Sequence, residues 1–177
     1  MTEPRLIDLR KTKLDGTILD LGGGGEGVIS RLFPSQVLAL DKRFDELEEA
    51  PGIQRALVAD GLHLPFGRAS FAACTSFFTL MYFLNEDLAP LARELHRVIQ
   101  PGGRLHLWEP VINSADPFLI DLEVWLPNEI IAVGYGVISP GKTQNARQLR
   151  HVFSEAGFRL DQENESMTNF EQDWIKV

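Results

Sequence analysis

Cysteine is nearly absent from this sequence: Cys74 is the only one among 177 residues. A single cysteine forms neither an internal disulfide nor a thiolate metal cluster, so we expect a reducing, cytoplasmic environment and no metal site. The sequence also lacks the run of roughly 18 consecutive apolar residues that a membrane-spanning helix needs. Its first residues show no basic region followed by an apolar run, so no secretory signal is expected either.

Basic residues are also scarce, with 17 lysines and arginines against 25 aspartates and glutamates and a net charge of −8. Proteins that wrap nucleic acid usually carry a basic patch, because neutralising phosphates drives their affinity. The longest basic cluster is Arg10, Lys11 and Lys13, which is typical of a solvated helix end. We therefore expect neither nucleic acid nor a membrane as a partner.

Apolar residues make up 44% of the chain, enough for one substantial core, and the length suits a single domain over residues 1–177. We find no internal repeat and no low-complexity linker. Short apolar runs predict strands, and apolar residues at helical spacing predict the helices between them. In chain order we expect strands at residues 17–21, 36–40, 54–59, 69–75 and 104–108, and helices at 28–33, 44–50 and 88–99.

Continuous apolar strands joined by helices predict an α/β fold, an open and mostly parallel Rossmann-like sheet covered by helices on both faces. Ligands bind such sheets at the carboxyl ends of the strands. A helix at residues 146–156 and two strands at 158–164 and 170–177 then predict a closing antiparallel hairpin. Residues 117–139 stay undecided, because the Pro-Asn pair at 127–128 suits either a hairpin turn or a helix break.

A glycine-rich loop, Leu21-Gly22-Gly23-Gly24-Gly25-Glu26-Gly27, follows the first expected strand. Glycines allow a tight turn and the close approach of a ligand to the backbone. Gly22, Gly24 and Gly27 match the G-x-G-x-x-G pattern, and Asp41 follows Gly22 by 19 residues. This spacing is typical of a dinucleotide site, in which the acid holds ribose hydroxyl groups, so a nicotinamide-dependent oxidoreductase is one alternative.

Several features favour S-adenosylmethionine (SAM) over a dinucleotide. Asp20 lies two residues before Gly22, where a dinucleotide would bring its pyrophosphate, and Glu26 adds a second negative charge to the loop. SAM has no phosphate, and its ammonium and sulfonium groups tolerate a nearby carboxylate. No second catalytic domain is expected in a chain of this length. A loop without a ligand is disfavoured, because four successive glycines are entropically costly to order.

Six segments, in this order, resemble the motifs of class I SAM-dependent methyltransferases, and they extend over nearly the whole chain. The resemblance lies in the order and spacing of the six, since each is weak alone. The segments are ILDLGGG at 18–24, LALD at 38–41, DGLHLPF at 60–66, FAACTSFFTLMY at 71–82, ELHRVIQPGG at 94–103 and FSEAGF at 153–158.

The resemblance implies a SAM site at the carboxyl edge of the sheet, with roles that follow from position. Asp20 and the backbone of Gly22 and Gly24 would hold the methionine part of SAM. Asp41 would accept hydrogen bonds from the ribose hydroxyl groups, with Lys42 beside it.

The adenine and the reacting centre are implied in the same way. Asp60 would accept a hydrogen bond from the adenine amino group, and the backbone of Gly61 and Leu62 would meet the ring. Ser76 and Phe77, at the end of the fourth strand, would lie near the sulfonium and the acceptor.

The sequence departs from the family pattern in two places. Glu26 stands where the family usually has its third glycine and Gly27 follows one place late, so Glu26 faces either the ligand or the solvent. Family members also commonly carry N-terminal helices that cover the substrate, whereas about 16 residues precede the first strand here. We therefore expect an insertion at 111–139 to form a lid over the cleft or the interface of a homodimer.

No catalytic residue is assigned from the sequence, because the sulfonium already activates the methyl group and the protein mainly aligns and shields it. Glu109 and Tyr135 are candidates for orienting the acceptor. Residues 76–79 replace the N-P-P-[FY] segment typical of amide or nucleobase methylation. We expect a SAM-dependent methyltransferase that acts on a small-molecule acceptor by in-line displacement, with a non-catalytic SAM-binding module or partner subunit as the alternative.

Overall fold

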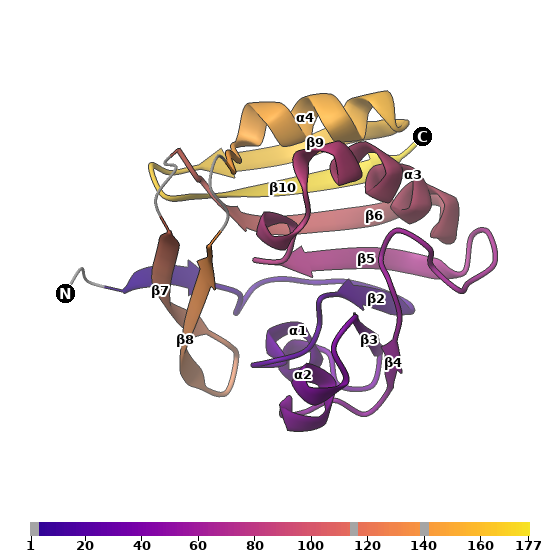
Figure 1. The fold of residues 1–177 in the computed structure, drawn as a ribbon. Helices are drawn as coiled ribbons and strands as arrows, with labels where there is room; N and C mark the ends of the chain where they lie inside the picture. The colour runs from indigo at the N-terminus through magenta and orange to yellow at the C-terminus, as the bar shows by residue number, and fades with distance from the viewer. Residues whose placement is uncertain (1–3, 114–116, 139–141) are drawn as a thin grey trace.

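The main element of the fold is a seven-stranded sheet with the order β4-β3-β2-β5-β6-β10-β9 (Figure 1). It is seen in a computed structural model that describes residues 4–113, 117–138 and 142–177. The first five strands in this order, β4, β3, β2, β5 and β6, are parallel. Strand β10 runs antiparallel to both β6 and β9, and this arrangement confirms the predicted fold class. The strands are β2 (Ile18–Leu21), β3 (Val37–Asp41), β4 (Ala56–Val58), β5 (Phe71–Phe77), β6 (Ile99–Pro110), β9 (Phe158–Glu165) and β10 (Asn169–Lys176).

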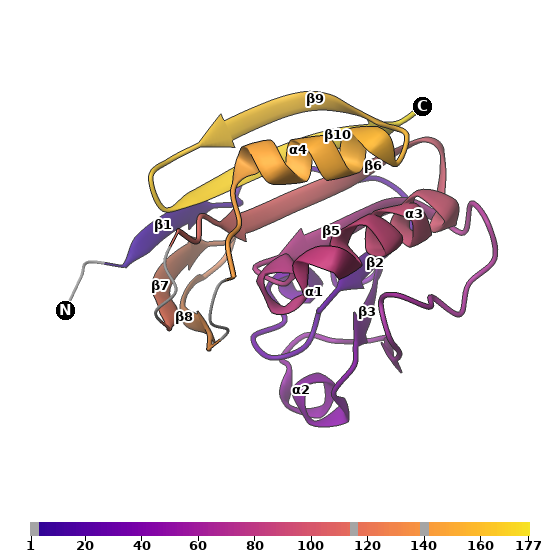
Figure 2. The same cartoon turned by 45° about the horizontal axis from the view of Figure 1, so that its top comes forward.

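Helices cover both faces of this sheet. The buried residues of α3 and α4 belong to one apolar cluster and those of α1 and α2 to another, so each pair covers its own face (Figure 2). Among the described residues, no helix is both long enough and apolar enough to span a bilayer. The helices are α1 (Val28–Leu32), α2 (Phe44–Glu49), α3 (Leu88–Val98) and α4 (Ala146–Glu155), with two short 3-10 helices, η1 (Leu80–Tyr82) and η2 (Asn85–Asp87).

The undecided segment forms a hairpin. Strands β7 (Phe118–Trp125) and β8 (Ile130–Val137) pair antiparallel, and β1 (Arg5–Asp8) adds to β7 in parallel as the third strand of a small sheet. The strand β1 was not predicted, because four residues with one buried side chain, Ile7, give no periodic signal. The small sheet packs into the same apolar cluster as α1 and α2, so it covers the part of that face that the two helices leave.

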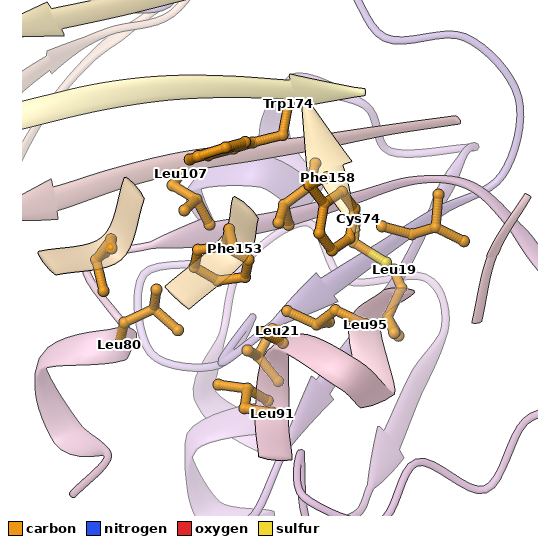
Figure 3. Close-up of a cluster of buried hydrophobic side chains, with 14 of the residues drawn as sticks. Leu19, Leu21, Cys74, Leu80, Leu91, Leu95, Leu107, Phe153, Phe158 and Trp174 are labelled. Atoms are coloured by element: carbon orange, nitrogen blue, oxygen red, sulfur yellow. The ribbon is translucent and has the colours of Figure 1, made fainter. Parts of the chain in front are cut away.

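The core between the sheet and α3 and α4 contains Trp174, the largest fully buried side chain among the described residues (Figure 3). Trp174 and Phe153 are fully buried and their ring centroids lie 5.8 Å apart. Helical spacing predicted the buried face of α3, and Leu91 and Leu95 lie on it as expected. This packing fixes the strands whose carboxyl ends carry the glycine loop and the segment after β5.

Strand β6 is longer than predicted. The sequence indicated a strand at 104–108 after a turn at Pro101, whereas the strand begins at Ile99 and shifts its register against β5 between Phe71 and Ala73. A Cβ on Gly103 would lie 2.7 Å from the Ala72 carbonyl oxygen, so the strands approach closely at this bulge. The residues expected to form a turn after Pro101 are therefore part of β6, next to the bulge in its pairing with β5.

Candidate functional site

A cavity of about 700 Å³ opens at the carboxyl ends of β2, β3, β4 and β5. Parallel strands bring these ends to one edge of the sheet, which is where ligands of such folds bind. Two of the predicted site residues, Asp20 and Ser76, are not among the described lining residues. The others do line it: Gly22, Gly24, Asp41, Lys42, Asp60, Gly61, Leu62 and Phe77.

The glycine loop forms a tight part of the cavity wall. Gly22 has a φ of +67° and donates its N–H to the Leu40 carbonyl at 2.7 Å. A Cβ on Gly22 would lie 2.3 Å from the side chain of Thr79, and one on Gly24 would lie 2.6 Å from the Cβ of Glu46. Both positions therefore require glycine for space, and Gly22 requires it for its backbone conformation as well.

Asp20 lies beneath the glycine loop rather than in the cavity. Its carboxyl group is buried, accepts the Thr75 hydroxyl at 2.7 Å, and has an oxygen 2.6 Å from where a Cβ of Gly23 would lie. Burial raises the pKa of Asp20 to about 7, and the nearby charge of Asp41 adds to this. Asp20 therefore supports the loop from below, and direct contact with a ligand stays a prediction.

Asp41 ends β3 and points one oxygen toward the loop. Its Oδ1 accepts the backbone N–H of Arg43 at 2.9 Å. Its Oδ2 lies 3.1 Å from the position of a Cβ on Gly24. Because Oδ1 is held by the backbone, Oδ2 is oriented toward the cavity and suits a pair of hydroxyl donors.

Asp60 follows β4 and is engaged on both oxygens. Its Oδ1 accepts the Leu62 N–H at 3.0 Å and its Oδ2 accepts the Lys42 ammonium at 3.2 Å. The Leu62 N–H is the main reason that the pKa of Asp60 is below its ordinary value. Lys42, predicted beside Asp41, thus bridges the ends of β3 and β4.

Gly61 allows two apolar side chains to close in beside Asp60. A Cβ on Gly61 would lie 2.9 Å from the Leu21 side chain and 3.2 Å from the ring of Phe83. Leu21 and Phe83 line the cavity together with Leu62. These apolar side chains lie beside Asp60, and the adenine ring's place against them stays a prediction.

Ser76 and Phe77 point to opposite sides of β5, as successive strand residues do. Phe77 lines the cavity, whereas the buried hydroxyl of Ser76 donates to Glu109 at 2.7 Å. Of the two residues expected near the sulfonium and the acceptor, Phe77 is among the described lining residues and Ser76 is not. The role of Phe77 at the reacting centre stays a prediction.

Phe77, Phe78, Tyr82 and Tyr135 form a region of the lining that we call the aromatic wall. Phe78 is held in the left-handed region at φ +52°, and its ring stacks on Tyr135 with centroids 5.2 Å apart. Phe77 meets Tyr135 edge-on at 6.1 Å. A non-glycine residue at positive φ is strained, and such strain is common at ligand sites.

The hairpin of β7 and β8 reaches the cavity with Gly134, Tyr135 and Gly136. Arg31 of α1 pairs with Glu129 of the hairpin turn at 2.9 Å. Burial raises the pKa of Tyr135, so its hydroxyl is a neutral hydrogen-bonding group rather than a base.

This position supports the lid predicted for residues 111–139. Residues 114–116 and 139 of that insertion lie outside the described residues. The stacking of Phe78 on Tyr135 links β8 to the segment that directly precedes η1. The lid and the homodimer both stay predictions.

Carboxylates outnumber cations in the described lining. Arg43 pairs with Asp45 and Glu46, and Lys42 pairs with Asp60, so both cations are already engaged. Such a surface attracts a cation and repels a pyrophosphate, which fits the ammonium and sulfonium of SAM and not a dinucleotide. The acidic lining residues are Glu26, Asp41, Glu46, Asp60 and Asp87, and the basic ones are Lys42 and Arg43.

Sequence reasoning missed several lining residues. Thr79 packs on Gly22, and Phe83 on Gly61, but both follow the end of β5 in a segment whose path no periodicity indicates. Glu46 lies on α2, which was predicted as a helix without a role in the site. The family-like segment at 71–82 was the available signal for Thr79.

The family profile described as "Methyltransferase domain" matches residues 19–107, about half of the chain. The matched segment runs from β2 into β6 and contains the glycine loop, Asp41 and Asp60. It thus includes most of the cavity edge described above.

Two curated relatives are methyltransferases. A demethylmenaquinone methyltransferase of Thermus thermophilus is 35% identical over 119 residues, 59% of this chain and 52% of the relative. A demethylspheroidene O-methyltransferase of Rhodobacter capsulatus is 27% identical over 168 residues, 87% of this chain and 38% of the relative. The chain therefore spans about half or less of the length of these relatives.

Solved structures share the fold at low identity. A SAM-dependent methyltransferase of Methanosarcina mazei has a TM-score of 0.67 and 20% identity, with 92% of this chain and 93% of that chain covered. One from Mesorhizobium loti has a TM-score of 0.67 and 18% identity, with 90% and 91% covered.

Proposed function

We propose, for a chain that belongs to the class I SAM-dependent methyltransferase family, that it transfers the methyl group of SAM to a small-molecule acceptor. The observation that carries the proposal is the cavity itself. Its edge at β3 and β4 is acidic, with Asp41 and Asp60 at successive strand ends, and the aromatic wall lies beyond the end of β5. One cavity thus joins a cofactor edge to an apolar acceptor region.

SAM supplies an activated methyl group on a sulfonium when it is bound. Asp41 would hold the ribose through its cavity-facing oxygen, and the glycine loop would let the methionine part lie against the backbone. The aromatic wall and the β7–β8 hairpin would exclude water from the sulfonium and fix the acceptor for in-line attack. Neither task requires a general base unless the acceptor must lose a proton.

A small apolar acceptor fits the aromatic wall. Phe77, Phe78 and Tyr135 present ring surface, and aromatic surface favours flat or apolar partners. The two curated relatives are named for demethylmenaquinone and demethylspheroidene, and acceptors of this apolar kind are the first to test.

Titration calorimetry with SAM and with NADH, followed by a turnover assay, tests the proposal. We expect SAM and S-adenosylhomocysteine to bind and NADH not to bind. We also expect S-adenosylhomocysteine to form when SAM and the protein are mixed with demethylmenaquinone or demethylspheroidene. Binding of SAM without turnover on any small-molecule acceptor would favour a SAM-binding module, and binding of NADH alone would overturn the proposal.

Replacing Asp41 by asparagine should weaken SAM binding by at least about tenfold, which corresponds to about 1.4 kcal/mol. The reason is that a carboxylate accepting hydroxyl hydrogen bonds makes charge-assisted contacts worth roughly 1.5–3 kcal/mol each. The matched control is Asp45→Asn, since Asp45 lies four residues further on, in the first turn of α2, and pairs with Arg43 without lining the cavity. Equal dissociation constants for both variants in calorimetry would remove Asp41 from the site.

A further inference from the structure

Glu109, a candidate from the sequence for orienting the acceptor, is fully buried and is not among the described residues that line the cavity. It stands near the end of β6, and its Oε1 accepts the Ser76 hydroxyl at 2.7 Å. The same oxygen accepts the backbone N–H groups of Thr79 at 3.1 Å and Leu80 at 2.9 Å. Its Oε2 accepts the side-chain amide of Gln144 at 3.2 Å. Glu109 therefore holds the N-terminal end of η1.

Lys142 holds the other end of the same short helix. It is 6% exposed, and its ammonium donates to the carbonyl oxygens of Phe83 and, at 3.4 Å, Leu80. Burial lowers the pKa of Lys142, and the negative charge of Glu109 opposes this lowering. A carboxylate at the N–H end and an ammonium at the carbonyl end both match the dipole of η1.

The segment between these two charges, residues 79–83, carries Tyr82 of the aromatic wall and, in Thr79, a contact with the glycine loop. Phe78 immediately precedes Thr79, which packs on Gly22. Tyr82 is the last residue of η1 and lines the cavity together with Gly136 of the hairpin. A shift of η1 would therefore move Tyr82 and, through Thr79, the neighbouring Phe78, whose ring stacks on Tyr135 of β8.

We propose that Glu109 and Lys142 are positioning residues that clamp η1 from both ends and so set the aromatic wall for the acceptor. The proposal rests on the methyl transfer function proposed above, because it assigns the wall to the acceptor. Neither residue is among the described residues that line the cavity, so both act through η1.

The pairing of buried charges distinguishes a clamp from two independent contacts. Removing one charge leaves the other buried without its counter-charge, whereas removing both leaves no unpaired charge. Glu109→Gln and Lys142→Met should each loosen η1 and speed the exchange of its amides. The double variant should increase amide exchange by less than the product of the two single increases.

The test uses the two tyrosines of the sequence, Tyr82 and Tyr135, both of which line the cavity. Labelling with 3-fluorotyrosine gives one fluorine resonance from each. We expect both resonances to shift or broaden in Glu109→Gln and in Lys142→Met, and to return toward their original positions in the double variant. We also expect the Thr79 and Leu80 amides to exchange at least about tenfold faster in the single variants.

The matched control is Lys176→Met. Lys176 donates to the carbonyl oxygens of His96 at 2.7 Å and Ile99 at 2.8 Å, so it holds the end of α3 as Lys142 holds the end of η1. It lies outside the cavity lining, and its removal should leave both fluorine resonances unchanged.

Unchanged resonances in folded Lys142→Met protein would overturn the clamp, as would strictly additive effects in the double variant. If Glu109→Gln does not fold, Lys142→Met and the double variant still decide. Binding of S-adenosylhomocysteine is measured on each protein. Absence of that binding in the unmodified protein contradicts the proposed function, while the fluorine spectra still judge the clamp separately.

Discussion

Replacing Gly22 by alanine should abolish SAM binding, with a loss of affinity of at least about 100-fold, or about 2.7 kcal/mol. The new Cβ would lie 2.3 Å from both Oγ1 and Cγ2 of Thr79, so the loop or η1 has to move. The φ of +67° adds a backbone penalty of roughly 1–2 kcal/mol for a residue with a side chain. Together the two effects should lower the free energy of unfolding by about 2–5 kcal/mol.

The matched control is Gly102→Ala. Gly102 has a similar φ of +74°, but among the described residues no atom beyond its chain neighbours lies within 4 Å of a Cβ placed there. This variant should lose only the backbone penalty and should bind SAM as before. Calorimetry and urea unfolding on both variants separate the two contributions. Unimpaired SAM binding by Gly22→Ala would show that the loop does not contact the cofactor.

The residues at the strand ends were predictable because each strand is marked by a short apolar run, which is a local feature of the sequence. Each of Gly22, Asp41 and Asp60 follows a short apolar run, and parallel pairing brings such run ends to one edge. The spacing of apolar residues likewise predicted α3. What was predicted correctly therefore depends on periodicity and on turns that glycine defines.

The other half of the cavity depends on contacts between distant segments. Tyr135 lies on β8, which pairs with β7, and β7 pairs in turn with β1, a strand of four residues that no pattern indicates. Ser76 was assigned to the site from its place at a strand end, but side chains alternate along a strand and its hydroxyl points to Glu109. To predict which of two neighbouring strand residues faces a ligand, one has to know the register of the strand in the sheet. The sequence alone does not specify this register.

Asp20 should make the stability of the protein depend on pH in an unusual direction. Burial raises its folded-state pKa to about 7 from the ordinary 3.8, against the opposing hydrogen bond of Thr75. The folded protein therefore holds a proton that the unfolded chain releases from about pH 4 upward. Stability is then fully present below pH 4, falls as the pH rises toward 7, and is lowest above 7. A shift of about 3 pKa units corresponds to at most about 4 kcal/mol.

Asp20→Asn should remove this dependence while preserving the shape of the side chain. Urea unfolding at pH 5, 6.5 and 8 should show that the free energy of unfolding of the variant, relative to that of the unmodified protein, increases as the pH rises. Part of the slope should remain, because burial also raises the pKa of Glu109 to about 7 and that group is unchanged. Glu48→Gln, which removes an exposed carboxylate of α2, is the control and should follow the unmodified protein at every pH. Parallel curves for Asp20→Asn and the unmodified protein would mean that Asp20 is ionised in the folded state, and that a positive charge or water near the glycine loop stabilises it.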